Sequence, residues 1–220
     1  MNQRDVPYAL TMSSSGQWGV TPRILARLVV GLWLFGTGDA FIIHAAAGNA
    51  PWTVLAQGVS LHTPLTVGMA TIGLGVVILL LWIPLQVRPG VGTVLNVALI
   101  GTAIDVMRPL LPAVDAMVGR ALLILIGTAL VGLGSGLYLS AARGPGPRDG
   151  LMTGLHRRTG VSIAVVRGSI EFSALTGGWL LGGTVGVGTI VFALLIGPSV
   201  QAGMWVAGVA GQSRAGAPRA

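Results

Sequence analysis

The sequence lacks cysteine and lysine altogether, and only 9% of its 220 residues are charged. Without cysteine the chain can form no disulfide, no thiolate nucleophile and no cysteine-ligated metal site. Soluble globular chains carry about 25% charged residues, so this chain has too little charge to cover a water-exposed surface. The low charge therefore excludes a soluble globular domain and indicates a protein that lies in the membrane.

All thirteen basic residues are arginine and the acids number six, which gives a net charge of +7. In a soluble protein this excess would suggest a nucleic-acid partner. In a membrane protein it is more typical of cytoplasmic loops beside anionic lipid headgroups. We therefore expect the lipid bilayer as a partner and no nucleic acid.

Six apolar runs approach the roughly 20 residues that a spanning helix needs. They cover residues 24–47, 64–85, 91–110, 119–141, 160–182 and 186–207. The expected fold class is thus an all-α, polytopic membrane protein with six transmembrane helices. The expected division is a cytoplasmic N-terminal tail (1–23), two membrane repeats (24–110 and 111–207) and a cytoplasmic C-terminal tail (208–220).

Two further segments, 51–61 and 147–157, are too short to cross a bilayer. Each starts at a proline, which is favoured at the first position of a helix. They are predicted to be re-entrant half-helices or helices lying at the interface, and the sequence leaves both readings open.

The chain repeats itself with an offset of 96 residues. Among the 71 residue pairs from 31/127 to 101/197, 20 are identical, and the matches gather at the glycine and proline turns. Such self-similarity indicates duplication. Each copy holds three spanning runs and one short segment. An odd number of spans makes the second copy enter from the opposite face, so the copies are predicted to be inverted repeats.

The arginine distribution supports this arrangement. With the N-terminus in the cytoplasm, only Arg108 and Arg120 lie in an external connection, and ten arginines lie in cytoplasmic segments. This positive-inside bias predicts that both termini are cytoplasmic. The ten are Arg4, Arg23, Arg27, Arg88, Arg143, Arg148, Arg157, Arg158, Arg214 and Arg219.

Charged groups within spans usually face a cavity or a partner. Asp39 lies in the first predicted span, and Arg167 and Glu171 lie four residues apart in the fifth. The two residues of the fifth span can form an ion pair on one helix face, either as packing or as part of a site. Asp39 can pair with Arg167, bind a cation, carry a proton, or be a protonated structural acid.

The short segments supply the other candidate site. A helix N-terminus offers unpaired N–H groups and a partial positive charge, which suits a ligand near the membrane midplane. Arg148 and Asp149 follow the proline of the second segment, and Gln57 lies in the first. The alternative is a capped interfacial loop with its arginines on headgroups. The candidate substrate-binding set is therefore Asp39, Gln57, Arg148, Asp149, Arg167 and Glu171.

No pair among His44, His62 and His156 has metal-ligand spacing, and no nucleophile–base set or phosphate loop can be assembled. We expect no metal, no cofactor and no enzymatic activity.

Three stretches, Gly48–Gly58, Arg88–Thr93 and Gly144–Met152, resemble the YczE/YyaS/YitT family of bacterial membrane proteins. The resemblance extends from about residue 24 to 205. It implies a multi-span protein of the bacterial inner membrane and names no substrate. Thr53 occupies the repeat position that corresponds to Asp149, so the two copies do not offer a symmetric pair of acids.

The expected function is a small-molecule transporter, or a transporter-like protein, with an unknown ligand. The alternative is a substrate-capturing or regulatory membrane subunit that acts with a separate protein partner. A homo-oligomer is compatible with both.

Overall fold

The computed structural model describes residues 17–208, and this part of the chain is all-helical, with no strand. Arg4, Arg214 and Arg219 and most of the predicted tails lie outside the described residues. The helices are α1 (Pro22–Ala45), α2 (Pro51–Leu61), α3 (Val67–Leu85), α4 (Val91–Met107), the 3-10 turn η4 (Arg108–Leu110), α5 (Met117–Ser140), α6 (Pro147–Thr159), α7 (Ile163–Leu180) and α8 (Val187–Val206).

Among residues 17–208, five helices are long and apolar enough to cross a membrane: α1, α3, α4 with its 3-10 extension, α5 and α8. Large apolar side chains cover their outer faces. Leu80 on α3 and Leu194 on α8, for example, are 57% and 70% exposed. Soluble monomers rarely expose extensive apolar patches to water. The described chain is therefore a helical, multi-pass membrane protein.

The predicted fifth span corresponds to α7, which has 18 residues and is not among those five helices. Arg167 and Glu171 make α7 less apolar than α3, α5 and α8. The six-span count therefore stays a prediction. The two short segments do form helices, α2 with 11 residues and α6 with 13.

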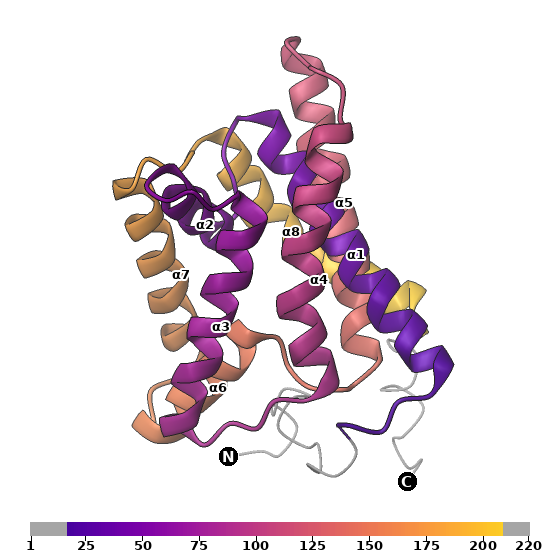
Figure 1. The fold of residues 1–220 in the computed structure, drawn as a ribbon, viewed down its shortest axis with the longest axis vertical. Helices are drawn as coiled ribbons and strands as arrows, with labels where there is room; N and C mark the ends of the chain where they lie inside the picture. Colours follow the sequence, from indigo (N-terminus) through magenta and orange to yellow (C-terminus); the bar gives the residue numbers. More distant parts are fainter. Residues whose placement is uncertain (1–16, 209–220) are drawn as a thin grey trace, which may run out of the picture.

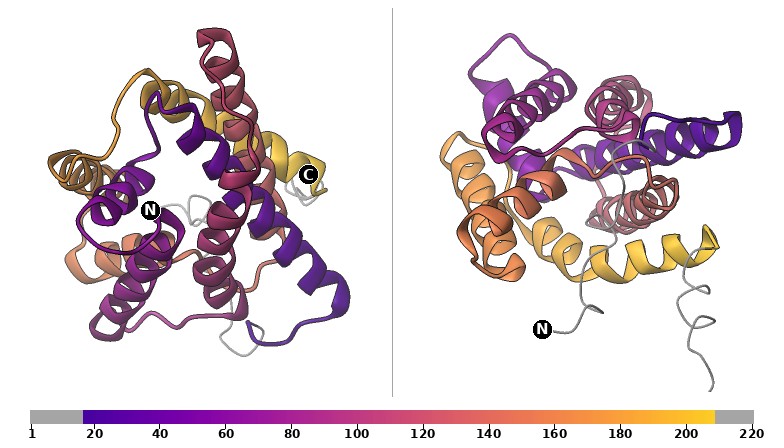
Figure 2. Two further views of the ribbon diagram at one scale, coloured as in Figure 1. Left: turned by 45° about the horizontal axis from the view of Figure 1, so that its top comes forward. Right: turned by 90° about the horizontal axis from the view of Figure 1, so that it is seen from below.

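Glycine contacts hold α1 and α5 together through the middle of the molecule (Figure 1). A Cβ added to Gly31 would lie 2.8 Å from the carbonyl oxygen of Gly134, and one added to Gly127 would lie 2.7 Å from that of Gly38. Small residues at such crossings let the backbones of membrane helices approach closely. Next to this pair, α4 packs on α1 and α8 packs on α5. The remaining helices lie together on one side, where α2 packs on α7 and α3 packs on α4 and α6 (Figure 2).

Corresponding elements recur 96 residues apart. Helices α2, α3 and α4 begin at residues 51, 67 and 91, and α6, α7 and α8 begin at 147, 163 and 187. Backbone details recur with them. Ala46 and Ala142 both have φ of 51°, and Gly48 and Gly144 have φ of 117° and 115°. These left-handed conformations reverse the chain before each short helix, where glycine is favoured because it has no Cβ.

The helix starts differ in their capping. The long helices α1, α3 and α7 are capped by the side chains of Thr21, Thr66 and Ser162, each of which accepts a hydrogen bond from a backbone N–H of the first turn. The short helices α2 and α6 follow Ala50 and Gly146, and neither has a side-chain cap. Their first-turn N–H groups are thus left for other acceptors.

Candidate functional site

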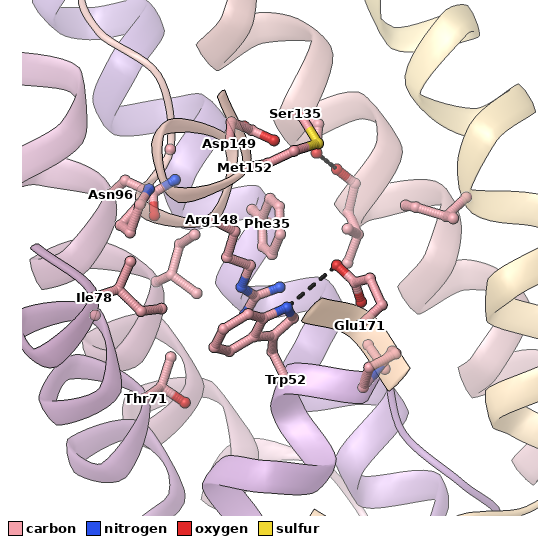
Figure 3. Close-up of a pocket in the computed structure, with 18 of the residues that line it drawn as sticks. Phe35, Trp52, Thr71, Ile78, Asn96, Ser135, Arg148, Asp149, Met152 and Glu171 are labelled. Carbon is pink, nitrogen blue, oxygen red and sulfur yellow. Dashed lines mark hydrogen bonds between the residues drawn. The ribbon is translucent and has the colours of Figure 1, made fainter. Parts of the chain in front are cut away.

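A cavity of about 480 Å³ lies inside the helix bundle, and every one of the eight helices contributes to its wall. The wall is mostly apolar, with side chains such as Phe35, Ile78 and Met152 (Figure 3). Mostly apolar walls with a few placed polar groups are typical of small-molecule sites. The polar and charged side chains of the wall are Thr71, Asn96, Ser135, Tyr138, Arg148, Asp149, Arg167 and Glu171.

Both short helices begin at this cavity, since Pro51 and Pro147 are part of its wall. The first hydrogen bonds within these helices are Val54 N–H to Ala50 O, at 2.8 Å, and Gly150 N–H to Gly146 O, at 3.0 Å. Proline has no N–H, so the orphan donors of the first turns are the amides of residues 52, 53, 148 and 149. Two helix N-termini, each with a partial positive charge, therefore border one cavity.

Arg148, Trp52 and Glu171 form a contact chain across three helices. The guanidinium carbon of Arg148 on α6 lies 4.9 Å from the ring centroid of Trp52 on α2. The indole Nε1 of Trp52 donates a hydrogen bond to Oε1 of Glu171 on α7, at 3.2 Å (Figure 3). The partner of Glu171 is therefore an indole N–H, whereas the sequence predicts Arg167 from its own helix.

Asp149 is the second carboxylate of the wall. Its Oδ2 lies 3.2 Å from the point where a Cβ of Gly146 would stand, so the side chain turns back over the start of α6. The side chain is exposed to the cavity, whose wall also holds the guanidinium groups of Arg148 and Arg167.

Four of the six candidate residues therefore lie together: Arg148, Asp149, Arg167 and Glu171 all line the cavity. Asp39 lies on α1, is only 3% exposed and is not part of the cavity wall.

Gln57 is also outside the wall, and it joins two loops. Its Oε1 accepts hydrogen bonds from Asn49 Nδ2 and from the backbone N–H of Thr184, both at 2.8 Å, and its Nε2 donates to Thr184 Oγ1 at 3.0 Å. Through these hydrogen bonds Gln57 connects α2 to the segment that leads to α8. The three histidines bond to backbone carbonyls: His44 to Pro112, His62 to Gly58 and His156 to Val161.

Sequence reasoning missed Trp52, although a signal for it exists. Trp52 and Arg148 are exactly 96 residues apart, and each follows the proline that starts its short helix. Comparing the residue after each proline in the two copies would have singled out this pair. The offset of 96 residues also pairs Asn96 with Phe192, and both of these side chains line the cavity.

On one side of the cavity the two bordering helices, α3 and α4, pack tightly against each other. Gly68 on α3 and Gly101 on α4 are in backbone contact. Asp105 on α4 strengthens this contact, because its Oδ1 accepts the backbone N–H of Gly68 at 2.9 Å and its Oδ2 accepts the hydroxyl of Thr66. Sequence reasoning also missed Asp105, which lies near a helix end, where an acid reads as an interfacial residue.

On the side of α7 and α8 the corresponding positions are open. A Cβ added to Gly101 would lie 2.6 Å from Cγ1 of Ile72, whereas 96 residues further on Gly168 and Gly197 have no atom within 4 Å of an added Cβ. Side chains of both helices, including Arg167 and Phe192, nevertheless line the cavity. The cavity is thus bordered by one packed helix pair and one separated pair.

The fold and this cavity define a multi-pass helical membrane protein with polar groups gathered inside its bundle. The chain belongs to the family described as "Family of unknown function (DUF6198)", whose profile matches residues 22–204. It is 39% identical over 189 residues to an uncharacterized protein of Haemophilus influenzae, which covers 86% of this chain and 87% of that protein. It is 36% identical over 169 residues to the uncharacterized membrane protein YczE of Bacillus subtilis, which covers 76% and 79% respectively. The resemblance to the YczE group is thereby confirmed, and no solved structure matches the chain.

Proposed function

We propose that this chain is a small-molecule transporter of the bacterial inner membrane that opens its central cavity to one side at a time. The observation that carries the proposal is the difference between the two helix pairs that border the cavity. Ile72 and Gly101 are packed together between α3 and α4, whereas Gly168 and Gly197 have open space between α7 and α8. In a two-fold related pair of gates, this is the arrangement of one closed and one open gate.

The proposal includes an inverted repeat, and reciprocal contacts between the two copies support it. The hydrogen bond from Gly92 N–H to Arg143 O and the one from Gly188 N–H to Ala47 O are both 2.8 Å long. Adding 96 to one partner of the first bond and subtracting 96 from the other gives the second bond. The same exchange relates the Gly31–Gly134 contact to the Gly127–Gly38 contact. Reciprocal contacts of this kind are expected of two copies around a two-fold axis.

The proposed topology has six spans with both termini in the cytoplasm, and α7 is the fifth span, in addition to the five apolar helices. Figure 1 draws the connection that contains residue 115 at the top of the molecule, and the 86–90 and 141–146 connections at the bottom. Arg88 and Arg143 lie in the bottom connections, which fits a cytoplasmic location. In this topology α2 and α6 are re-entrant, because their N-termini reach the internal cavity from opposite ends.

Transport then requires the two gates to exchange their states. The α7–α8 pair closes by adopting the contact now seen between α3 and α4, and the α3–α4 pair opens in turn. Exchange of two packed arrangements about a fixed site is the usual form of alternating access. The proposal includes no chemical step on the ligand.

Disulfide trapping tests this exchange, since the chain has no native cysteine. A Cβ on Gly75 would lie 3.4 Å from Cβ of Val97, close to the roughly 3.5–4.5 Å between the Cβ atoms of a disulfide, so Gly75→Cys with Val97→Cys reports the closed α3–α4 gate. Gly168→Cys with Gly197→Cys reports closure of the α7–α8 gate. In native membranes we expect an oxidant to cross-link both pairs.

A control pair, Gly73→Cys with Gly168→Cys, places both thiols at glycines with open surroundings on different helices. It should remain uncrosslinked. Cross-linking of the 75/97 pair alone would contradict alternating access. That result would favour the alternative reading, a static capturing or regulatory subunit, which co-purification of an energising ATPase would support.

A further inference from the structure

The wall of the cavity carries equal numbers of opposite charges. Two guanidinium groups, on Arg148 and Arg167, face two carboxylates, on Asp149 and Glu171. A net charge enclosed among apolar helices is costly unless it is compensated. A ligand with a single net charge would leave one charge uncompensated in this wall, whereas an overall neutral ligand would not.

Each arginine of the wall lies near an acid: Arg148 is next to Asp149 at the start of α6, and Arg167 is four residues from Glu171 on α7. Arg148 lies at the start of α6, beside the orphan amides of residues 52, 53, 148 and 149. Because Arg148 contacts Trp52 through the ring face, the N–H groups at the guanidinium edge stay available. This end of the cavity therefore offers several hydrogen-bond donors to one carboxylate.

A hydrogen-bond acceptor is available on α7. Glu171 uses Oε1 for the indole of Trp52, which leaves Oε2 as an acceptor. Figure 3 shows the guanidinium of Arg148 over the ring of Trp52 and Glu171 at the N–H edge of the same ring, so the donor end and the acceptor end of the cavity meet at one indole. A ligand that carries no charged group would leave the guanidinium edge of Arg148 and Oε2 of Glu171 without hydrogen-bond partners. Each of these groups would then carry its full desolvation cost.

We propose that the cavity takes a small zwitterion, with one carboxylate and one protonated amine on an apolar body, as in an apolar α-amino acid. This assignment rests on the proposed function, because it names the ligand class of the same cavity. The carboxylate binds at Arg148 between the starts of α2 and α6. The amine binds at Glu171, and the apolar body lies against side chains such as Ile78 and Phe35.

A probe series that removes one charge at a time tests the assignment. The probes are L-phenylalanine, L-phenylalaninamide, which lacks the carboxylate, and 3-phenylpropanoate, which lacks the amine. L-leucine, L-leucinamide and 4-methylpentanoate repeat the series on a smaller body. Binding is measured at pH 7 by thermal shift and by titration of the purified full chain in detergent. We expect at least one of the two zwitterions to bind, and both of its truncated analogues to bind at least about tenfold more weakly.

Two variants assign the ends of the ligand. Arg148→Gln should abolish the preference for the carboxylate over the amide. Glu171→Gln keeps an oxygen for the Trp52 N–H, and should abolish the preference for the amine. Loss of each preference separately cannot follow from a general loss of fold. Arg157→Gln, on the exposed end of α6 outside the cavity wall, is the matched control and should change neither.

Tighter binding of either singly charged analogue, equal binding of all three probes, or binding of none would overturn the assignment. The gate cross-links are read independently of any ligand. If both gates cross-link while the zwitterions fail, the ligand class is wrong and the transport proposal survives. If zwitterions bind while the 168/197 pair never cross-links, the ligand class survives and transport is wrong.

Discussion

Gly31 of α1 and Gly134 of α5 touch backbone to backbone, so that a Cβ on Gly31 would lie 2.8 Å from the oxygen of Gly134. This contact and its counterpart between Gly38 and Gly127 leave no room for a side chain along the central helix pair. Helices in a bilayer gain no hydrophobic advantage from associating with each other, so close packing of this kind stabilises the bundle.

The first prediction therefore concerns a single methyl group. Gly134→Ala should lower the free energy of unfolding by roughly 1–3 kcal/mol, because the added Cβ meets the backbone of α1, which cannot move aside. Denaturation of the purified protein in detergent measures the change. Gly197→Ala, also within a helix but with open surroundings, is the control and should be neutral or stabilising by about 0.5–1 kcal/mol. Equal effects at the two positions would disprove the packing argument.

The second prediction concerns the contact that Asp105 makes with α3. Asp105→Ala removes the acceptor of the Gly68 N–H and of the Thr66 hydroxyl, which should cost about 1–3 kcal/mol of stability in the α3–α4 contact. If the two gates exchange states, loosening this one should increase disulfide formation by the 168/197 cysteine pair. Asp115→Ala, in an exposed connection, should leave cross-linking unchanged. An unaltered 168/197 yield in both variants would show that Asp105 does not control the gate.

The third prediction separates Gln57 from the ligand. Gln57→Ala removes the acceptor of the Asn49 Nδ2 and Thr184 N–H donors, so the free energy of unfolding should fall by about 2–4 kcal/mol. Folded Gln57→Ala protein should bind ligand with unchanged affinity, since Gln57 is not part of the cavity wall. Gln201→Ala, exposed on α8, is the control for stability. A large loss of affinity with unchanged stability would place Gln57 in the binding site instead.

The fourth prediction concerns topology. Single cysteines introduced at Asp115 and at Arg157 can be probed with an impermeant thiol reagent in intact cells. The Asp115→Cys variant should react from outside, whereas the Arg157→Cys variant should react only after the membrane is permeabilised. Ser14 and Ser213, which lie outside the described residues, should behave as Arg157 does. Labelling of both Asp115 and Arg157 from outside would reject the six-span arrangement.

The helices could be predicted closely from the sequence, and the reason is physical. Apolar runs of bilayer length, with proline and glycine at their ends, leave few alternatives to helix in a membrane. The predicted run 64–85 became α3, which starts at Val67 after the Thr66 cap, and the short segments became α2 and α6. The run 160–182 became α7, whose Arg167 and Glu171 keep it outside the five candidate spans.

The site could be predicted only in part. Arg148, Asp149, Arg167 and Glu171 are charges in an apolar context, and the cost of placing them in lipid identifies them. Their partners depend on which helices cross, and the spacing along one helix does not contain that information. For this reason the Trp52–Glu171 hydrogen bond, which joins residues 119 positions apart, could not be anticipated.

The two hydrogen bonds that cross between the halves, Gly92 to Arg143 and Gly188 to Ala47, have a consequence for biosynthesis. Each half supplies the acceptor for a donor in the other half. The carbonyl of Ala47 can therefore accept its hydrogen bond only after residue 188 has left the ribosome. The first half, made alone, should be inserted but incompletely packed, and should be a substrate for membrane proteases. A gene divided in the 111–116 connection should yield stable protein only when both fragments are made in the same cell.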